Sequence, residues 1–256
     1  MSALPWQTAP GLATAAPADD AATLAVHVQV WRPAERPQLV TGECETAALI
    51  LHGTFDLTAG PADGAHTAWP ARGARNSPFE GRPMAVFLPP HTVFGARGDA
   101  GEIALFAARQ PAAADPTATG RAALSQSPLL PLAGSGKAFD PGSGEWRPAE
   151  TFPTAAESLP PRRMQRRSFG EVAVERVFAA DYKARTLTVD ELVLQPGQSL
   201  AIAAIDDRPT HSELLVFERI GDNDRARLVS TPGGAVDLTL AAADAPVYAV
   251  VAYLGK

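Results

Sequence analysis

The sequence predicts an all-β protein made of two similar β domains. Glycine and proline account for 21 and 24 of the 256 residues, and they interrupt the chain too often for long helices. The apolar segments between them are short and rich in valine, leucine, isoleucine and phenylalanine, which is typical of strands. Many short strands separated by turns favour barrel or sandwich domains.

Five segments of the first half are expected to be strands, because they are short apolar or alternating runs between turn residues. They are Leu24–Trp31, Ala47–Leu51, Phe55–Thr58, Met84–Leu88 and Ile103–Ala107. Gly53-Thr54 predicts a hairpin turn between the second and the third of these strands.

Seven segments of the second half are expected to be strands for the same reason. They are Val172–Phe178, Thr186–Leu194, Leu200–Ala204, Glu213–Ile220, Ala226–Ser230, Val236–Leu240 and Val247–Leu254. Hairpin turns are expected at Gly221–Asp224 and at Pro232–Gly234.

The two halves follow one plan, which indicates a duplicated unit. Pro33 precedes the strand around Leu49–Leu51 by about as many residues as Pro196 precedes the strand around Leu214–Val216. Between the halves, alanine, proline, serine and glycine dominate, so we expect a linker that crosses the surface, with a short helix at Thr119–Leu124. The expected division is a flexible N-terminus at 1–20, an N-terminal barrel at 21–110, the linker at 111–164 and a C-terminal barrel at 165–256.

Charge and hydropathy exclude several classes of partner. The chain has 28 acidic and 22 basic residues, a net charge of -6, which argues against nucleic-acid binding by bulk positive charge. It has no run of about 18 apolar residues, so neither a transmembrane helix nor a membrane partner is expected. Residues 1–20 carry no signal-peptide pattern, and we expect a cytoplasmic location.

The residue types that usually carry catalysis are scattered. The single cysteine, Cys44, lies between Glu43 and Glu45, whose negative charges disfavour a reactive thiolate. The histidines, none at ligand spacing from another, are His27, His52, His66, His91 and His211. Each alone fits a structural histidine better than a metal ligand. His211 and Glu213 are two residues apart, so on a strand their side chains would share a face.

Two segments of the first half resemble a known family. Ser77–Thr92, which reads SPFEGRPMAVFLPPHT, resembles a conserved stretch of the 5-deoxy-glucuronate isomerases of inositol catabolism. Ala48–Thr54, which reads ALILHGT, resembles the strand and turn that precede that stretch in the family. These proteins and the related 4-deoxy-5-ketouronate isomerases are bicupins. The resemblance therefore implies two cupin-type β-barrel, or jelly-roll, domains in one chain.

The resemblance also implies where a site would lie. The family holds a divalent metal such as zinc or manganese in its second barrel, through histidines, a following glutamate and a later histidine. Here Asp206 and Arg208 stand where the first two histidines belong, Glu213 matches the glutamate, and no histidine follows His211. A guanidinium cannot coordinate a cation, so we expect no bound metal and no other cofactor.

Three functions remain open. In the first, a divergent bicupin without the family metal binds a sugar acid, or serves as a regulator, through Asp206, Asp207, Arg208, His211 and Glu213 at the mouth of the second barrel. In the second, an aldose–ketose isomerase of a uronate-like or deoxy-keto sugar acid has a rearranged site, with Glu213 as the catalytic group that moves the proton. In the third, the role is purely structural. By analogy with the family, we expect a homodimer.

Overall fold

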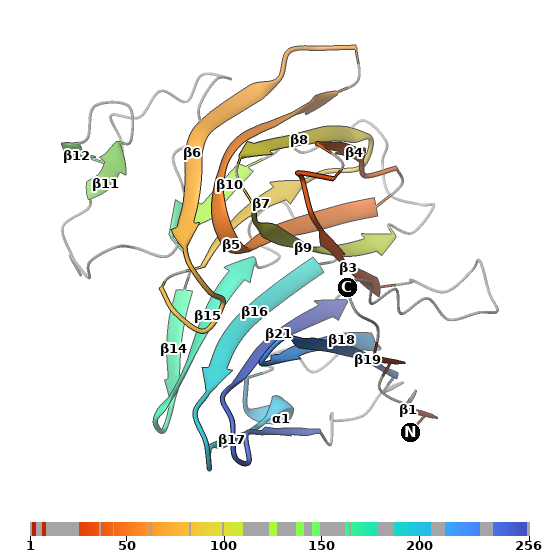
Figure 1. Cartoon of the computed structure of the whole chain (residues 1–256), viewed down its shortest axis with the longest axis vertical. Helices are drawn as coiled ribbons and strands as arrows, with labels where there is room; N and C mark the ends of the chain where they lie inside the picture. Colours follow the sequence, from red (N-terminus) through yellow and green to blue (C-terminus); the bar gives the residue numbers. More distant parts are fainter. Residues whose placement is uncertain are drawn as a thin grey trace.

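The structure, a computed structural model, describes most of both halves of the chain (Figure 1). The described residues are 2–3, 7–8, 26–35, 37–42, 44–61, 63–81, 83–98, 100–109, 123–126, 137–140, 145–148, 162–163, 165–178, 187–205, 213–230 and 238–254. Within these ranges nearly all regular structure is β, and α1 (Ile202–Ile205) is the one helix. The same ranges contain no helix with the length and apolar content needed to cross a membrane.

The first half curls two sheets around one long strand, β5 (Cys44–Pro61). Its other strands are β3 (Val26–Trp31), β4 (Gln38–Val40), β6 (Thr67–Arg75), β7 (Met84–Leu88), β8 (Thr92–Gly98), β9 (Glu102–Arg109) and β10 (Ala123–Gln126). The first part of β5 pairs with β7 and β9, and β3 pairs with β9. The second part of β5 pairs with β6 and β8, and β4 pairs with β8. One bent strand therefore belongs to both sheets.

The second half contains one broad sheet and one small one. Its strands are β14 (Gln165–Phe169), β15 (Val172–Phe178), β16 (Leu187–Leu194), β17 (Ser199–Ala201), β18 (Glu213–Ile220), β19 (Asn223–Ser230), β20 (Thr239–Ala241) and β21 (Val247–Leu254). The broad sheet has the order β14-β15-β16-β21-β18-β19, and β1 (Ser2–Ala3) and β2 (Gln7–Thr8) add to β19. The small sheet is β17 paired with β20.

Strand pairing confirms the duplicated unit. The order β3-β9-β5-β7 in the first half matches β16-β21-β18-β19 in the second, and the pair β4-β8 matches β17-β20. All these pairs are antiparallel. The order of the matched strands along the chain is also the same, so the two halves are two copies of one jelly-roll plan.

The copies differ at one place. In the first half, the second part of β5 and β6 lie between the matched strands β5 and β7 along the chain. In the second half, only Gly221 and Asp222 separate β18 from β19, because Ile220 pairs directly with Asn223. No residues are left for an equivalent strand pair there. Among the described residues, the small sheet of the second half therefore has two strands where the first half has four.

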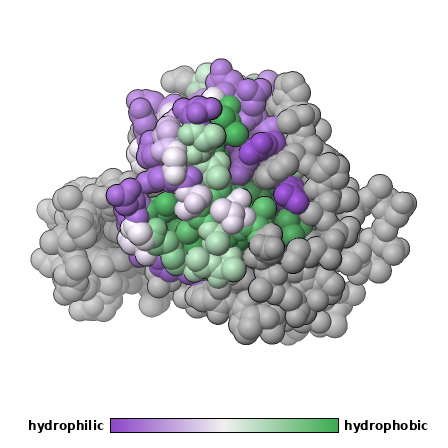
Figure 2. Space-filling view, turned by 90° about the horizontal axis from the view of Figure 1, so that it is seen from below, coloured by the Kyte–Doolittle hydropathy of each residue, from purple (hydrophilic) through white to green (hydrophobic). Residues whose placement is uncertain are grey.

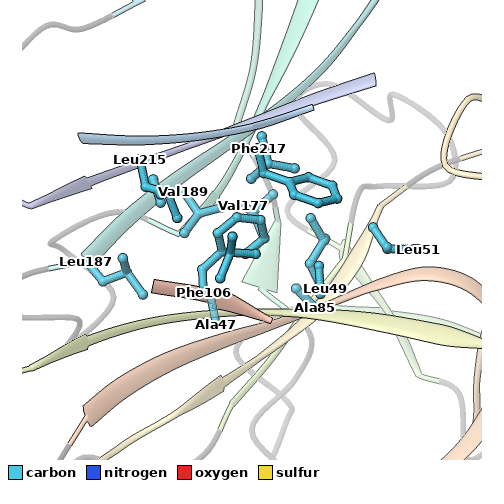
Figure 3. Packing of buried hydrophobic residues seen from close by; sticks show 14 of the residues in the cluster. Ala47, Leu49, Leu51, Ala85, Phe106, Val177, Leu187, Val189, Leu215 and Phe217 are labelled. Carbon is cyan, nitrogen blue, oxygen red and sulfur yellow. The ribbon is translucent and has the colours of Figure 1, made fainter. Parts of the chain in front are cut away.

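Three groups of buried apolar side chains fill the layers. One lies inside the first half and one inside the second. A third lies between the halves and takes residues from both (Figure 3). Alternation along β5 explains how one strand serves two cores: Leu49 and Leu51 face the second half, whereas Ala48 and Ile50 face the inside of the first.

The outer face of the small sheet carries few large side chains. Figure 2 views the molecule from the side of the second half, and a hydrophobic area lies in the middle of that face with hydrophilic residues above it. Leu200, Ile202 and Leu240 are buried against the broad sheet. The exposed residues of β17, α1 and β20 are Ser199, Ala201, Ala203, Ala204, Thr239 and Ala241.

Most expected strands are confirmed among the described residues, and three expectations are wrong. Ala47–Leu51 and Phe55–Thr58 belong to one strand, and Gly53-Thr54 lies inside it, where register shifts bend β5 without reversing it. Gly53 has a φ of 99°, which a residue with a Cβ rarely adopts. Only the start of Leu200–Ala204 is a strand, since α1 begins at Ile202. Ala123 and Leu124 belong to β10, so a helix at Thr119–Leu124 is wrong at those residues.

Candidate functional site

The residues expected to form the site lie mostly outside the described residues. Asp206, Asp207, Arg208 and His211 fall in the undescribed range 206–212. Glu213 begins β18, where its backbone pairs with Ser230 and Leu254, and its side chain is outside the described part. Whether these five residues bind a ligand stays a prediction.

The described inner face of the second half is rich in arginine. Asp190 of β16 is fully buried and receives hydrogen bonds from Arg176 Nε at 2.9 Å, Arg176 Nη2 at 3.0 Å and Arg167 Nη2 at 2.9 Å. Arg167 Nη1 also donates to the carbonyl oxygen of Ile205, the last residue before the undescribed range, at 2.9 Å. On the same face, Glu218 pairs with Arg225.

This donor set does not fit the divalent metal that the family resemblance implies. Both oxygens of Asp190 already accept hydrogen bonds from guanidinium groups. Among the described residues, no group of three or more histidine, cysteine, aspartate or glutamate side chains is arranged to hold a metal ion. Two arginines around a carboxylate stabilise its negative charge and disfavour a further cation.

A polar cavity of about 640 Å³ lies elsewhere, between the two halves. Its lining comes from the end of β3, from β5, from the loop after β6, from the start of β9 and from the β18–β19 hairpin. The lining residues are Arg32, His52, Asn76, Ser77, Pro78, Phe79, Glu102, Arg219, Gly221, Asp222 and Asp224. Its size suits a small-molecule ligand.

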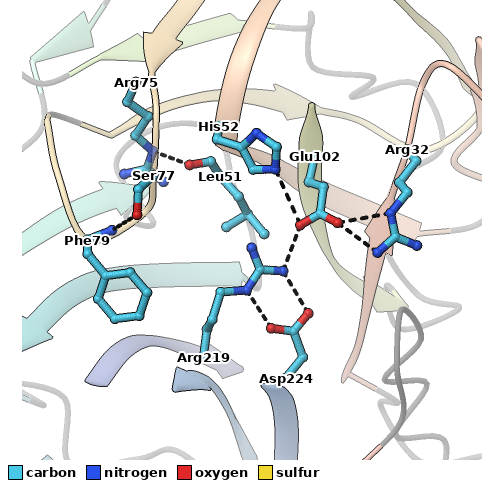
Figure 4. Close-up of polar contacts among 9 residues, drawn as sticks. All are labelled: Arg32, Leu51, His52, Arg75, Ser77, Phe79, Glu102, Arg219 and Asp224. Atoms are coloured by element: carbon cyan, nitrogen blue, oxygen red, sulfur yellow. Dashed lines mark hydrogen bonds and ion pairs between the residues drawn. The ribbon is translucent and has the colours of Figure 1, made fainter. Parts of the chain in front are cut away.

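Glu102 is the centre of the charged groups in this cavity (Figure 4). One carboxylate oxygen, Oε1, lies 2.9 Å from Arg32 Nε and 2.7 Å from Arg32 Nη2. The other, Oε2, lies 2.8 Å from Arg219 Nη2 and 3.6 Å from His52 Nε2. One carboxylate therefore links cationic groups from both halves of the chain.

Asp224 fixes the guanidinium of Arg219. Arg219 Nε and Nη2 lie 2.6 Å and 2.7 Å from the two oxygens of Asp224, as a bidentate pair. Burial lowers the pKa of Arg219, but Asp224 and Glu102 together raise it above its ordinary value. Arg219 and Asp224 are paired residues on either side of a two-residue turn, so the hairpin itself aligns them.

The first half contributes an aromatic wall to the cavity. After β6, the hydroxyl of Ser77 accepts a hydrogen bond from the Phe79 N–H at 3.1 Å, and the Glu80 N–H donates to the Ser77 carbonyl at 3.1 Å. This turn sets the Phe79 ring edge-on to the ring of Tyr248 from the second half, 6.3 Å between centroids. The ring thereby closes one side of a cavity whose other sides are charged.

The charge of Glu102 is expected to make stability depend on pH. Burial raises the pKa of Glu102, but Arg219 and Arg32 outweigh it and hold that pKa below its ordinary value of 4.5. The ionised Glu102 carboxylate therefore stabilises the native state above about pH 4.5, and this stabilisation is lost as the pH falls through the lower, native pKa. Glu102→Gln should have a lower urea midpoint than the wild type at pH 7, and the difference between the two midpoints should shrink progressively below pH 4.5.

The control for this titration is Glu80→Gln, which removes an exposed carboxylate. It should change the midpoint little at any pH. A constant difference between Glu102→Gln and the wild type from pH 7 to pH 3.5 would contradict the role of the ionised carboxylate.

Most of this cavity is not apparent from the sequence. The sequence predicts His52 to be a structural histidine, exposed or hydrogen-bonded, and it does not point to Glu102, Arg32 or Arg219. One signal was present: Arg219 and Asp224 flank the turn at Gly221-Asp222, and opposite charges at paired positions of a hairpin attract. The partnership of His52 with Glu102 depends on the register of β5 with β9, which the sequence does not display.

Comparisons with known proteins identify the fold. No family model matches the chain, and no curated protein matches it in sequence. An IolB-like protein from Salmonella typhimurium LT2 is similar in structure, with a TM-score of 0.52 and 17% identity over 90% of this chain and 84% of that one. The protein GK1651 from Geobacillus kaustophilus has a TM-score of 0.51 and 11% identity over 98% of this chain and 94% of that one. Together with the matched strand pairs, these likenesses show that the chain has the all-β bicupin fold, with two cupin-type barrels from a duplicated unit.

Proposed function

We propose that the protein binds a sugar acid in the cavity between its two halves, without a metal. One observation carries the proposal: both segments that resemble the 5-deoxy-glucuronate isomerases reach this cavity. His52 belongs to the segment Ala48–Thr54, and Ser77, Pro78 and Phe79 begin the segment Ser77–Thr92. The structural likeness to an IolB-like protein agrees with a ligand of this class.

The chemistry of the lining supports a ligand with hydroxyl groups and one carboxylate. Arg32, His52 and Asn76 offer N–H donors, and Asp222 offers acceptors, as a sugar with several hydroxyl groups requires. The Phe79 ring offers an apolar surface for the C–H face of a sugar ring. Arg32 is the cation available to a ligand carboxylate, since 40% of its side chain is exposed and its bonds to Glu102 use Nε and Nη2.

Replacing Arg32 tests the proposal. With D-glucuronate as the probe, Arg32→Gln should raise the Kd at least about tenfold, because a charge-assisted hydrogen bond is lost. The measurement is isothermal titration calorimetry on the full chain, with D-glucose as the neutral analogue. Arg97→Gln is the matched control, because Arg97 is an exposed arginine on β8 away from the cavity. Equal affinities of wild type and Arg32→Gln for D-glucuronate, or no binding of any of several sugar acids, would refute it.

The second candidate is isomerisation of such an acid, and the His52–Glu102 pair favours it. A carboxylate that stays ionised beside an imidazole can orient the ring for proton transfer, as in general-base catalysis. Incubation of the sugar acid with the protein in D₂O separates the two functions. Deuterium entering the carbon next to the carbonyl supports isomerisation, whereas an unlabelled, bound acid supports binding alone.

A further inference from the structure

A second cavity, of about 240 Å³, lies over β14–β16 and beneath the loop that joins β6 to β7. Its lining residues are Pro78, Gly81, Pro83, Arg166, Glu171, Ala173, Glu175, Glu191, Leu192, Val193, Gln195 and Gln198. Pro78 lines both cavities, but the charged residues of this one are all different from those around Glu102.

The lining of this second cavity is strongly acidic. It has three carboxylates, Glu171, Glu175 and Glu191, and one guanidinium, that of Arg166. Glu175 and Glu191 are directly paired residues on β15 and β16, so their side chains share one face of the sheet. Arg166 Nη1 is 3.4 Å from Glu175 Oε1, and the Arg166 side chain is 58% exposed, so water screens that pair.

Glu191 has an acceptor that the described residues leave unused. The residue is 4% exposed, and its Oε1 pairs with Arg75 Nη1 at 2.6 Å. Its other oxygen, Oε2, accepts no hydrogen bond from any described group. A buried carboxylate oxygen without a donor is costly, and Glu191 is one of the residues that line the cavity. Burial raises the pKa of Glu191, Arg75 opposes this, and the charge of Glu175 raises the pKa further.

The arrangement of acceptors in this cavity favours an ammonium group over a metal ion. The described residues around the cavity do not converge as a set of three metal ligands. The acceptors are instead spread over the carboxylates and the side chain of Gln195, while Gln198 Oε1 already accepts a hydrogen bond from the Gln195 N–H at 2.8 Å. A primary ammonium has one charge and three N–H donors, which suits several acceptors in one lining. We propose that this cavity binds a small primary amine in its protonated form.

Thermal unfolding of the full chain tests the proposal, with methylammonium chloride as the probe at pH 7. Tetramethylammonium chloride at equal ionic strength is the reference, because it has the same charge and no N–H donor. Methylammonium should raise the Tm above that in the reference salt, and the dependence on concentration gives an apparent Kd. Glu175→Gln should raise this Kd at least about tenfold.

Two further variants keep the result interpretable. Glu80→Gln removes an exposed carboxylate that does not line the cavity, and it should bind methylammonium as the wild type does. Glu171→Gln alters the exposed rim, and it should weaken binding even where Glu175→Gln fails to fold. Equal Tm values in the two salts, or equal Kd values for the wild type and these cavity variants, would overturn the proposal. These results are independent of D-glucuronate binding.

The same assay identifies the source of the amine. Nα-acetyl-lysine amide presents the ammonium as a lysine side chain does. Tighter binding of this compound than of methylammonium supports a lysine of another protein as the ligand, and weaker binding supports a free small amine.

Discussion

Replacing Arg75 with methionine is expected to lower the free energy of unfolding by about 3–5 kcal/mol, because it leaves the charge of Glu191 buried without its partner. The two side chains are 3% and 5% exposed and lie 2.6 Å apart. Arg75 Nε also donates to the Leu51 carbonyl oxygen at 2.9 Å. The pair joins β6 of the first half to β16 of the second.

The double variant Arg75→Met/Glu191→Met distinguishes loss of the pair from loss of packing. It should be more stable than Arg75→Met alone, because no charge is then buried without a partner.

The pH dependence of the Arg75→Met deficit gives a second check. In the native state the pKa of Glu191 is raised above its ordinary value of 4.5. Keeping Glu191 ionised therefore costs stability above its native pKa, and this cost disappears below pH 4.5. The deficit of Arg75→Met should therefore shrink from pH 7 to pH 4. Urea unfolding gives the free energy of unfolding of each variant at each pH. A deficit of Arg75→Met below about 1 kcal/mol at pH 7 would contradict the role of the ion pair.

Phe217→Ala is expected to cost about 3–5 kcal/mol, as truncation of a fully buried aromatic residue usually does. Phe217 is 0% exposed and packs edge-on to Phe106 of the first half, with 6.1 Å between centroids. Its ring also meets Tyr248 edge-on at 6.4 Å. The truncation would leave a new void at the interface between the two halves, with side chains of each half on one side of it.

The measurement is again urea unfolding, followed by tryptophan fluorescence and by circular dichroism. Phe217→Leu should cost less, because most of the buried volume remains. Val40→Ala is the surface control, since Val40 is 63% exposed and its truncation should change stability by less than about 0.5 kcal/mol. A cost for Phe217→Ala as small as that of Val40→Ala would show that the interface between the halves contributes little.

Local pattern predicted the strands that are buried on both faces. Met84–Leu88, Val172–Phe178, Glu213–Ile220 and Val247–Leu254 have the expected bounds, because mainly apolar runs between turn residues leave little choice. The strand Thr67–Arg75 was missed, since it contains proline and glycine and few large apolar residues. It is extended because β5 pairs with it, which is a tertiary effect.

The candidate site depends on the same tertiary effects. Glu102 meets Arg219 only because the two halves pack together, and their separation in the sequence hides the contact. The family resemblance predicts a site at Asp206–Glu213, whereas the described cavity lies at the segments that carry the resemblance in the first half. The domain borders, the linker over 111–164 and the homodimer stay predictions.

The shortened second copy of the unit makes the two barrels unequal in local stability. In the first half, β8 is held on one side by β4 and on the other by β5. Its counterpart β20 has a described partner on one side only, through three residue pairs with β17. Among the described strands, β17 and β20 pair only with each other, so we expect this part to open at a lower free energy than the rest. Opening there would expose the inner face around Asp190, which is fully buried in the closed structure.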